Sequence, residues 1–299
     1  MSYRKFLLVL VAALTVATAA AGSASGITHG RPDGSAHPYV GLMVALDKDG
    51  VPQWRCSGSL LSPTVFLTAG HCTVAPAAHI EVWMEEGPIE YDPDYAAAQD
   101  ADPDGIVSCN ASPTFDEYPC KGDVGGVPHP NPDFCNPCGS GLNRFAFRDL
   151  GVVTLNGSLS VSRYADLPEA GVVDTLPNKA PFDFVGYGVQ FQEQIPGAFL
   201  PKPPPFYRWA GPRQRMFASG ELVSQNFTNN EEYIRFSLNP SRGKGGTCFG
   251  DSGGPDLRGG TDTVMGVNSY VTNVNCSGIG YSQRVDISEV LDWINSFMS

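Results

Sequence analysis

The chain has 299 residues, of which 42% are hydrophobic and 17% charged, and this composition is sufficient for a sizeable core and excludes full-length disorder. Its 34 Gly and 25 Pro residues exceed average usage without a Gly-X-Y period, which favours many turns and short strands over long helices. The formal net charge of −12 gives no electrostatic basis for binding nucleic-acid phosphates or an anionic membrane, so we expect neither partner.

Residues 1–26 have the pattern of a secretion signal. Arg4 and Lys5 form a basic start, residues 6–14 an apolar centre, and residues 15–24 a tail of small residues. The apolar run is shorter than the roughly 20 residues that a membrane-spanning helix needs. We therefore expect residues 1–26 to be removed, which leaves residues 27–299 as a secreted, extracellular protein.

Short runs of β-branched and aromatic residues alternate with Gly, Pro and Asn breakers over residues 39–73 and 150–189. This pattern predicts antiparallel strands about every ten residues. The expected fold class is therefore all-β, as a sandwich or barrels.

An acidic, cysteine-containing insert interrupts the strand pattern at about residues 85–140. From Glu81 to Cys120 the chain carries eleven Asp or Glu residues and no Lys or Arg, which is typical of a solvated loop. Residues 100–105 have the alternate-carboxylate start of a calcium loop, but Ala111 stands where an EF-hand supplies its bidentate Glu. Calcium is thus only weakly supported, and we expect no cofactor.

Export changes how the eight cysteines are interpreted, because an oxidising compartment favours disulfides over thiolate metal sites. Cys135 and Cys138 have redox or zinc spacing, yet with no paired His nearby a structural disulfide is the better interpretation. The four cysteines of the insert permit three connectivities, and the sequence does not choose between them: Cys109, Cys120, Cys135 and Cys138.

Only the end of the chain has a clearly helical pattern. Asp286 or Ser288 is suited to capping this segment. The apolar positions that recur at helical spacing are Ile287, Val290, Leu291, Ile294 and Phe297. We expect an amphipathic C-terminal helix that packs on the strands.

Two segments carry residues suited to catalysis. Ser252 lies within Gly-Asp-Ser-Gly-Gly-Pro at residues 250–255, where a tight turn can direct successive N–H groups at one spot and so form an oxyanion hole. His71 stands beside Cys72, which can pair with Cys56. Such a bridge would hold the imidazole rigidly.

With these motifs the sequence resembles the chymotrypsin-like (trypsin-fold, S1-type) serine endopeptidase family over nearly all of residues 27–299. The matching segments occur in the family's order, at residues 27–30, 68–72, 149–155, 186–188, 250–255 and 269–271. The resemblance implies two antiparallel β-barrels with the active site in the cleft between them, which agrees with the all-β prediction. It also implies hydrolysis of peptide bonds through an acyl-enzyme.

The resemblance makes Ser252 the nucleophile, His71 the general base and then acid, and Asp149 the carboxylate that orients the imidazole. The backbone N–H groups of Gly250 and Ser252 would bind the developing oxyanion. The remaining histidines have no such context and are expected to be surface or packing residues: His29, His37, His79 and His129.

In this family Asp251 forms a buried ion pair with the mature α-amino group, here that of Ile27. Activity would then depend on cleavage before Ile27. Gly26 precedes it rather than Arg or Lys, so trypsin-type activation is unsupported. Signal peptidase could create this terminus directly after residues 24–26, whereas cleavage after residues 19–21 would leave a five-residue propeptide.

The resemblance also places the substrate pocket. Gly246 stands where trypsin-like members carry an Asp that receives Lys or Arg, and Val271 stands where wide-pocket members have Gly. Cleavage is therefore expected after small or medium apolar residues. The substrate-binding residues are assigned to Gly246, Thr247, Ser269, Tyr270, Val271 and Gly280, with Gly278 as a competing alignment for the last.

Two bridges match the family, Cys56 with Cys72 at the His loop and Cys248 with Cys276 at the pocket. The insert is longer than the family normally has between its His and Asp, and it would shield the site, bind a partner or only stabilise a long loop, the last being the default. We expect a monomer that acts on protein or peptide substrates.

Two other functions compete with a peptidase. The first is a non-catalytic binding protein on the same scaffold, because a fold does not fix a function. Intact His71, Asp149 and Ser252 argue against it, since a binding module has no need of all three. The second is a calcium-dependent adhesive or acidic surface protein, favoured only if the triad proves silent while the insert binds metal.

Overall fold

The computed structural model describes residues 27–50, 52–89, 122–136, 138, 146–194, 207–210, 213–223, 231–239, 244–273 and 275–298. The expected signal peptide, the calcium-type segment at residues 100–105, Cys109 and Cys120 lie outside these ranges. Of the insert, residues 85–89, 122–136 and 138 are described. There Cys135 is bridged to Cys138, which confirms the disulfide interpretation of this pair.

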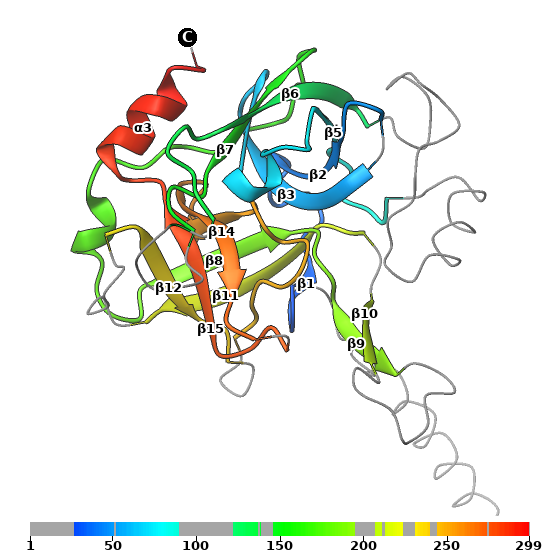
Figure 1. Ribbon diagram of the computed structural model, residues 1–299. Coiled ribbons are helices and arrows are strands. Elements are labelled where there is room, and N and C mark those ends of the chain that lie inside the picture. The colour runs from blue at the N-terminus through cyan, green and yellow to red at the C-terminus, as the bar shows by residue number, and fades with distance from the viewer. Residues whose placement is uncertain are drawn as a thin grey trace, which may run out of the picture.

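The N-terminal barrel consists of six antiparallel strands in the closed order β2-β3-β4-β7-β6-β5 (Figure 1). The strands are β2 (Val40–Leu46), β3 (Pro52–Ser62), β4 (Val65–Thr68), β5 (His79–Trp83), β6 (Val124–Pro130) and β7 (Gly151–Leu155). Their apolar side chains fill the interior, and Leu42, Phe66 and Val152 are fully buried. Burial of each such side chain contributes about 1.5–3 kcal/mol to stability.

The C-terminal barrel arises from a sheet in the order β1-β11-β12-β15-β14-β13-β8, which closes because β8 also pairs with β11. Inside it the ring of Phe236 packs on Phe182 and Phe184, with centroids 4.6 and 5.0 Å apart. The strands are β1 (Arg31–Pro32), β8 (Pro181–Gly186), β11 (Met216–Leu222), β12 (Tyr233–Ser237), β13 (Pro255–Arg258), β14 (Val264–Val271) and β15 (Ile279–Arg284).

The two barrels lie side by side in Figure 1, and the predictions of an all-β fold and of two antiparallel barrels are confirmed. A separate two-stranded sheet is formed by β9 (Phe191–Gln194) and β10 (Tyr207–Ala210). The strands expected over residues 150–189 are only partly present, because residues 156–180 form turns, loops and the 3-10 helix η2 (Val172–Thr175). Pro168 and Pro177 in this stretch lack the N–H groups that strand pairing needs.

The C-terminal helix is α3 (Ser288–Asn295), and its apolar face packs on the barrel core as predicted, with Val290 and Ile294 buried. The predicted cap is wrong, since Ile287 occupies the cap position and no side chain caps the helix. The Asp286 carboxylate instead accepts hydrogen bonds from the Arg284 guanidinium and from the Val173 N–H, so both of its oxygens are engaged outside the helix. Within the described part of the chain, no helix has the length and hydropathy to cross a membrane.

Candidate active site

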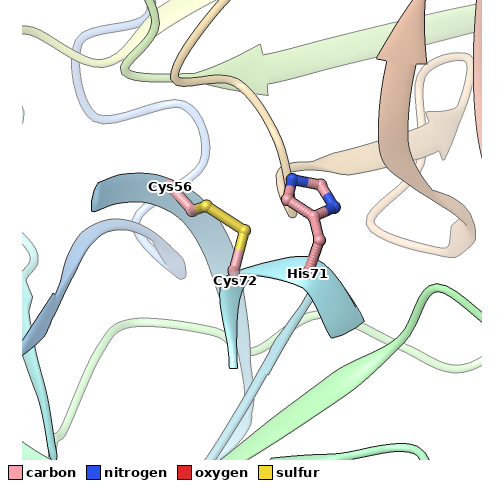
Figure 2. Close-up of side chains that lie close together, drawn as sticks. All are labelled: Cys56, His71 and Cys72. Carbon is pink, nitrogen blue, oxygen red and sulfur yellow. A yellow bond between two sulfur atoms is a disulfide. The ribbon is translucent and has the colours of Figure 1, made fainter. Parts of the chain in front are cut away.

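His71 is carried by η1 (Gly70–Cys72), a single turn of 3-10 helix after β4. Cys72 is bridged to Cys56 of β3, and a Cβ on Gly70 would come within 2.8 Å of the Phe134 ring, so glycine is required there. Figure 2 shows the imidazole beside this disulfide. One imidazole nitrogen and the two sulfur atoms lie within 4.8 Å of one another, but sulfurs joined in a disulfide offer no thiolate to a metal ion.

The carboxylate of Asp149 lies beside His71 and is only 1% exposed. Its Oδ2 atom is 2.9 Å from His71 Nδ1, and its Oδ1 atom accepts the His71 backbone N–H at 2.9 Å. The Ser269 hydroxyl of β14 also donates to Oδ2, and the Asp149 N–H donates to Gln283 Oε1 of β15 at 2.9 Å. Residues from both barrels thus hold the carboxylate in one orientation.

His71 and Asp149 shift each other's pKa values in opposite directions. Burial alone would lower the pKa of the imidazole and raise that of the carboxyl. The attraction and hydrogen bonds between the two groups outweigh burial, so the pKa of His71 lies above its ordinary value and the pKa of Asp149 below. An ionised carboxylate that accepts Nδ1–H leaves Nε2 as the proton acceptor of the ring.

Ser252 lies on the turn that leads from Cys248 into β13. Gly250 and Gly253 in this turn have φ values of +92° and +81°, a left-handed backbone that favours glycine. The Ser252 carbonyl accepts the Ser57 N–H at 2.7 Å, and the Gly253 N–H donates to the Asn268 carbonyl at 2.8 Å. The turn is therefore held between β3 of one barrel and β14 of the other.

The Ser252 turn lies against the loop that carries His71, because a Cβ on Gly253 would come within 2.9 Å of the Ala69 nitrogen. Ser252 is partly exposed. Among the hydrogen bonds of the described residues, none joins its hydroxyl to His71. Catalytic hydrogen bonds in free enzymes are often long and tighten when substrate binds.

Two amides of the turn point to an anion site. The N–H groups of Asp251, Gly253 and Gly254 each donate to a backbone carbonyl. Over the residues that the structure describes, the N–H groups of Gly250 and Ser252 have no acceptor. A tight turn with two such donors is suited to binding a developing negative charge.

Asp251 is buried next to the turn, and it accepts the Gly188 N–H at 2.8 Å and the Cys248 N–H at 2.9 Å. Burial outweighs these bonds and raises the pKa of Asp251 to about 7. Ile27 is fully buried in the C-terminal barrel core. Its nitrogen belongs to the peptide bond with Gly26 in this chain, and Thr28 forms an antiparallel bridge with Gly246.

A second buried carboxyl, that of Asp256 in β13, lies inside the C-terminal barrel on the face of its strand partner Phe184. Neither of its oxygens has a partner in hydrogen-bonding geometry among the described residues. Burial and the nearby charge of Asp251 raise the pKa of Asp256 well above its ordinary value, and the Ser282 hydroxyl opposes this only in part. Burial therefore favours the protonated form of this carboxyl.

We expect Asp256→Asn to stabilise the protein at alkaline pH. The folded protein keeps a proton that the unfolded chain releases above a pKa of about 3.9, so stability is lost as the pH rises past that value. Urea unfolding should show a larger gain for the variant at pH 8 than at pH 4. The exposed Asp166→Asn is the matched control, and equal effects of Asp256→Asn at both pH values would contradict the account.

Three of the residues assigned to the substrate pocket, Gly246, Val271 and Gly280, lie around Leu238 in the C-terminal barrel. Val271 of β14 is the strand partner of Gly280 in β15, and the Cys248–Cys276 bridge packs against Val271. Gly280 is buried whereas Gly278 is exposed, so Gly280 is the one that faces the interior. Of the other assigned residues, Thr247 is buried beside Gly246, Tyr270 stacks on Tyr281, and the Ser269 hydroxyl donates to Asp149.

The other four histidines lie away from this arrangement. His37 contacts the Asp33 carboxylate, His79 contacts Glu81, and His129 contacts the Thr154 hydroxyl. His29 is exposed.

Three residues that the sequence did not single out help to form the site. Gln283 binds the Asp149 amide, and the Ser57 hydroxyl links the Tyr187 N–H to the Gly250 carbonyl at 2.9 Å each. Leu238 contacts both pocket glycines. The sequence around these residues gives no signal for their roles, because Gln283 stands among other polar residues and a serine or leucine is ordinary in a strand-rich segment.

Comparisons with known proteins cover most of the chain. The family profile described as Trypsin matches residues 215–294. Chymotrypsin-like elastase family member 3A of Homo sapiens is 26% identical over 292 residues, covering 91% of this chain and 88% of that protein. Proproteinase E of Bos taurus is 26% identical over 263 residues, covering 83% of this chain and 85% of that protein.

Two solved structures share the fold. HL collagenase superposes with a TM-score of 0.60 at 18% identity, over 90% of this chain and 97% of the collagenase chain. VesB protease of Vibrio cholerae gives a TM-score of 0.52 at 17% identity, over 90% of this chain and 67% of that one. The shared fold therefore extends over nearly the whole length of this chain.

Proposed function

The chain belongs to the trypsin family of chymotrypsin-like proteins, and we propose that it is a secreted serine endopeptidase that hydrolyses peptide bonds through an acyl-enzyme. The observation that carries the proposal is the chain of contacts from Ser269 through Asp149 to His71, beside a turn on which Ser252 is partly exposed. An oriented imidazole next to an exposed serine is the arrangement that nucleophilic catalysis needs. A binding module on this scaffold would have no use for it.

In the proposed reaction, Nε2 of His71 takes the Ser252 proton while the serine oxygen attacks the scissile carbonyl carbon. Asp149 stabilises the imidazolium that forms. The N–H groups of Gly250 and Ser252 donate to the oxyanion. His71 then gives the proton to the leaving amine, and a water molecule releases the acyl group by the same steps, with His71 again acting first as base.

We propose that the P1 residue, which precedes the scissile bond, is small or medium and apolar. Gly246 brings no carboxylate to the pocket, so the charged end of Lys or Arg would be desolvated without a partner. Val271 adds a branched side chain to the facing wall, which shortens or narrows the space for P1. The buried and apolar surroundings of Gly280 favour the same preference.

We also propose that the protein is exported and acts as a monomer on protein or peptide substrates, with no nucleic-acid or membrane partner. Disulfides Cys56–Cys72, Cys135–Cys138 and Cys248–Cys276 are typical of an oxidising compartment. The net charge of −12 supports the expectation that neither nucleic acid nor an anionic membrane is bound.

A peptide library tests the proposed activity and preference together. The purified secreted protein is incubated with the library, and mass spectrometry identifies the new termini. We expect cleavage after Ala, Val and similar residues, and no cleavage by a Ser252→Ala sample prepared in parallel. Efficient cleavage after Arg would contradict the preference, and no cleavage by folded protein would contradict the peptidase itself.

Activity is expected to depend on a free terminus at Ile27. Burial raises the pKa of Asp251 to about 7, and an ammonium at Ile27 would favour its ionised form and fix its position. Loss of one partner of a buried pair costs about 3–5 kcal/mol, so forms extended before Ile27 and Asp251→Asn should lose at least about 10²-fold in kcat/KM.

N-terminal sequencing of the secreted protein, with activity measured on each form, checks this dependence. Ile27→Val keeps the ammonium and nearly the same side chain, so it should retain most of the activity. A fully active protein that begins elsewhere would contradict the pairing.

A further inference from the structure

Leu238 lies between the two glycines assigned to opposite sides of the substrate pocket. A Cβ on Gly246 would come within 2.6 Å of Leu238 Cβ and 2.7 Å of Cδ2, and a Cβ on Gly280 would come within 2.9 Å of Cδ1. Gly246 precedes the nucleophile turn and Gly280 belongs to β15, so two distant segments face one side chain. Both glycines and Leu238 are buried. The leucine therefore occupies the space at the level of these glycines.

The packing around Leu238 leaves it little freedom to move. Its side chain is fully buried in a cluster with Ile27, Met216 and Phe236. Its N–H donates to the Gly278 carbonyl at 2.9 Å, which ties the end of β12 to the loop before β15. Val271, at the end of β14, packs against the same cluster. Close-packed interiors tolerate the addition of even one methylene poorly.

We propose that Leu238 is a further specificity-determining residue of the pocket, because its side chain forms the floor between Gly246 and Gly280 and limits how deeply a P1 side chain can enter. The inference rests on the proposed function and adds to it a residue that sets the depth of the pocket. The absence of an acid at Gly246 explains why basic P1 residues are disfavoured. Leu238 explains why long apolar ones are disfavoured as well.

Leu238 is expected to limit the P1 residue only through the volume that its side chain fills. Shortening Leu238 opens space directly beneath the pocket, and a longer apolar P1 side chain can fill it and be removed from water. Discrimination of about 10–200-fold per methylene-sized difference is usual for an apolar pocket. The expected change is therefore in the ratio of substrates rather than in the catalytic step.

The test compares kcat/KM for matched peptides with Phe or Ala at P1, using protein that begins at Ile27. Leu238→Ala should raise the Phe to Ala ratio by at least about tenfold, and Leu238→Val should raise it less. Leu222→Ala is the matched control, because Leu222 is buried in the same core cluster but is not among the nearest neighbours that a Cβ on either glycine would meet. It should leave the ratio within about twofold while lowering Tm comparably.

Labelling by a fluorophosphonate gives the fraction of folded, active protein for every variant. If Leu238→Ala does not fold, the milder Leu238→Val decides the outcome. A variant that labels normally but keeps the wild-type ratio overturns the role of Leu238 and leaves the proposed function standing. A folded wild-type protein that neither labels nor cleaves peptides overturns the proposed function itself.

Discussion

Ser252→Ala is expected to lower kcat by about 10⁶-fold. Without the hydroxyl no acyl-enzyme can form, and the oriented His71 has no proton to accept. Because the Ser252 hydroxyl makes no hydrogen bond among the described residues, its removal should leave the fold intact. Steady-state hydrolysis of a peptide with Ala at P1, with Tm measured alongside, checks both statements.

Ser160→Ala provides the matched control, since Ser160 is exposed and lies in the loop after β7. It should keep wild-type activity and stability. Activity retained within tenfold in Ser252→Ala would mean that another group attacks the substrate, and the assignment of the nucleophile would be wrong.

Asp149→Asn is expected to lower kcat by about 10⁴-fold at neutral pH with the fold retained. The asparagine amide would donate to Nδ1 of His71, which places the ring proton on Nε2, where it cannot accept the proton of Ser252. The backbone N–H at this position can still donate to Gln283, because that bond does not involve the side chain that is changed.

Asp149→Asn should also shift the pH dependence of kcat/KM. Attraction to Asp149 holds the pKa of His71 above its ordinary value, and activity requires the neutral ring. In the wild type kcat/KM therefore rises with pH through this raised pKa. In the Asp149→Asn variant the pKa of His71 falls, so the rise should occur at lower pH. An unchanged inflection, or a loss smaller than tenfold, would contradict the role of Asp149.

Ser269→Ala separates orientation from charge. It removes one hydrogen bond to the Asp149 carboxylate and leaves both charges in place. We expect a small loss of kcat because the carboxylate is held less firmly, whereas the inflection should stay at higher pH than in Asp149→Asn because the charge that raises the pKa of His71 remains.

The sequence predicts the site best where the residues lie in short, glycine-rich or disulfide-linked segments. His71 is held by its neighbour Cys72, and Ser252 by the glycines on either side, so a local pattern predicts both positions. Asp149 is different, because its partners Ser269 and Gln283 come from β14 and β15, more than one hundred residues away in the chain. The role of Asp149 could be assigned only from the resemblance to the chymotrypsin-like family.

Leu238 could not be predicted for a related reason. It is an ordinary buried leucine by sequence, and its importance comes from the absence of side chains at Gly246 and Gly280, which the strand register brings to it. The prediction that Asp286 caps α3 was wrong because its carboxylate is bound by Arg284, two residues before it, and by η2. Competition of this kind depends on tertiary contacts, whereas the apolar periodicity of α3 is local and was predicted correctly.

The interior of the C-terminal barrel also contains a buried carboxyl, which the composition of the chain does not predict. Asp256 occupies a strand position whose partners are Phe184 and Gly266. Alternation alone would assign an acid at such a position to the surface. Its burial follows from the closure of the sheet between β8 and β11, which turns one face of every strand inward.

Ser252 should react as an activated nucleophile, and covalent labelling with a fluorophosphonate measures this reactivity. The purified protein with Ile27 at its terminus is labelled, digested and mapped by mass spectrometry, with Ser252→Ala treated in parallel. The account predicts one labelled residue, Ser252, and none in the variant. Absence of labelling in folded protein, or labelling at another residue, would contradict it.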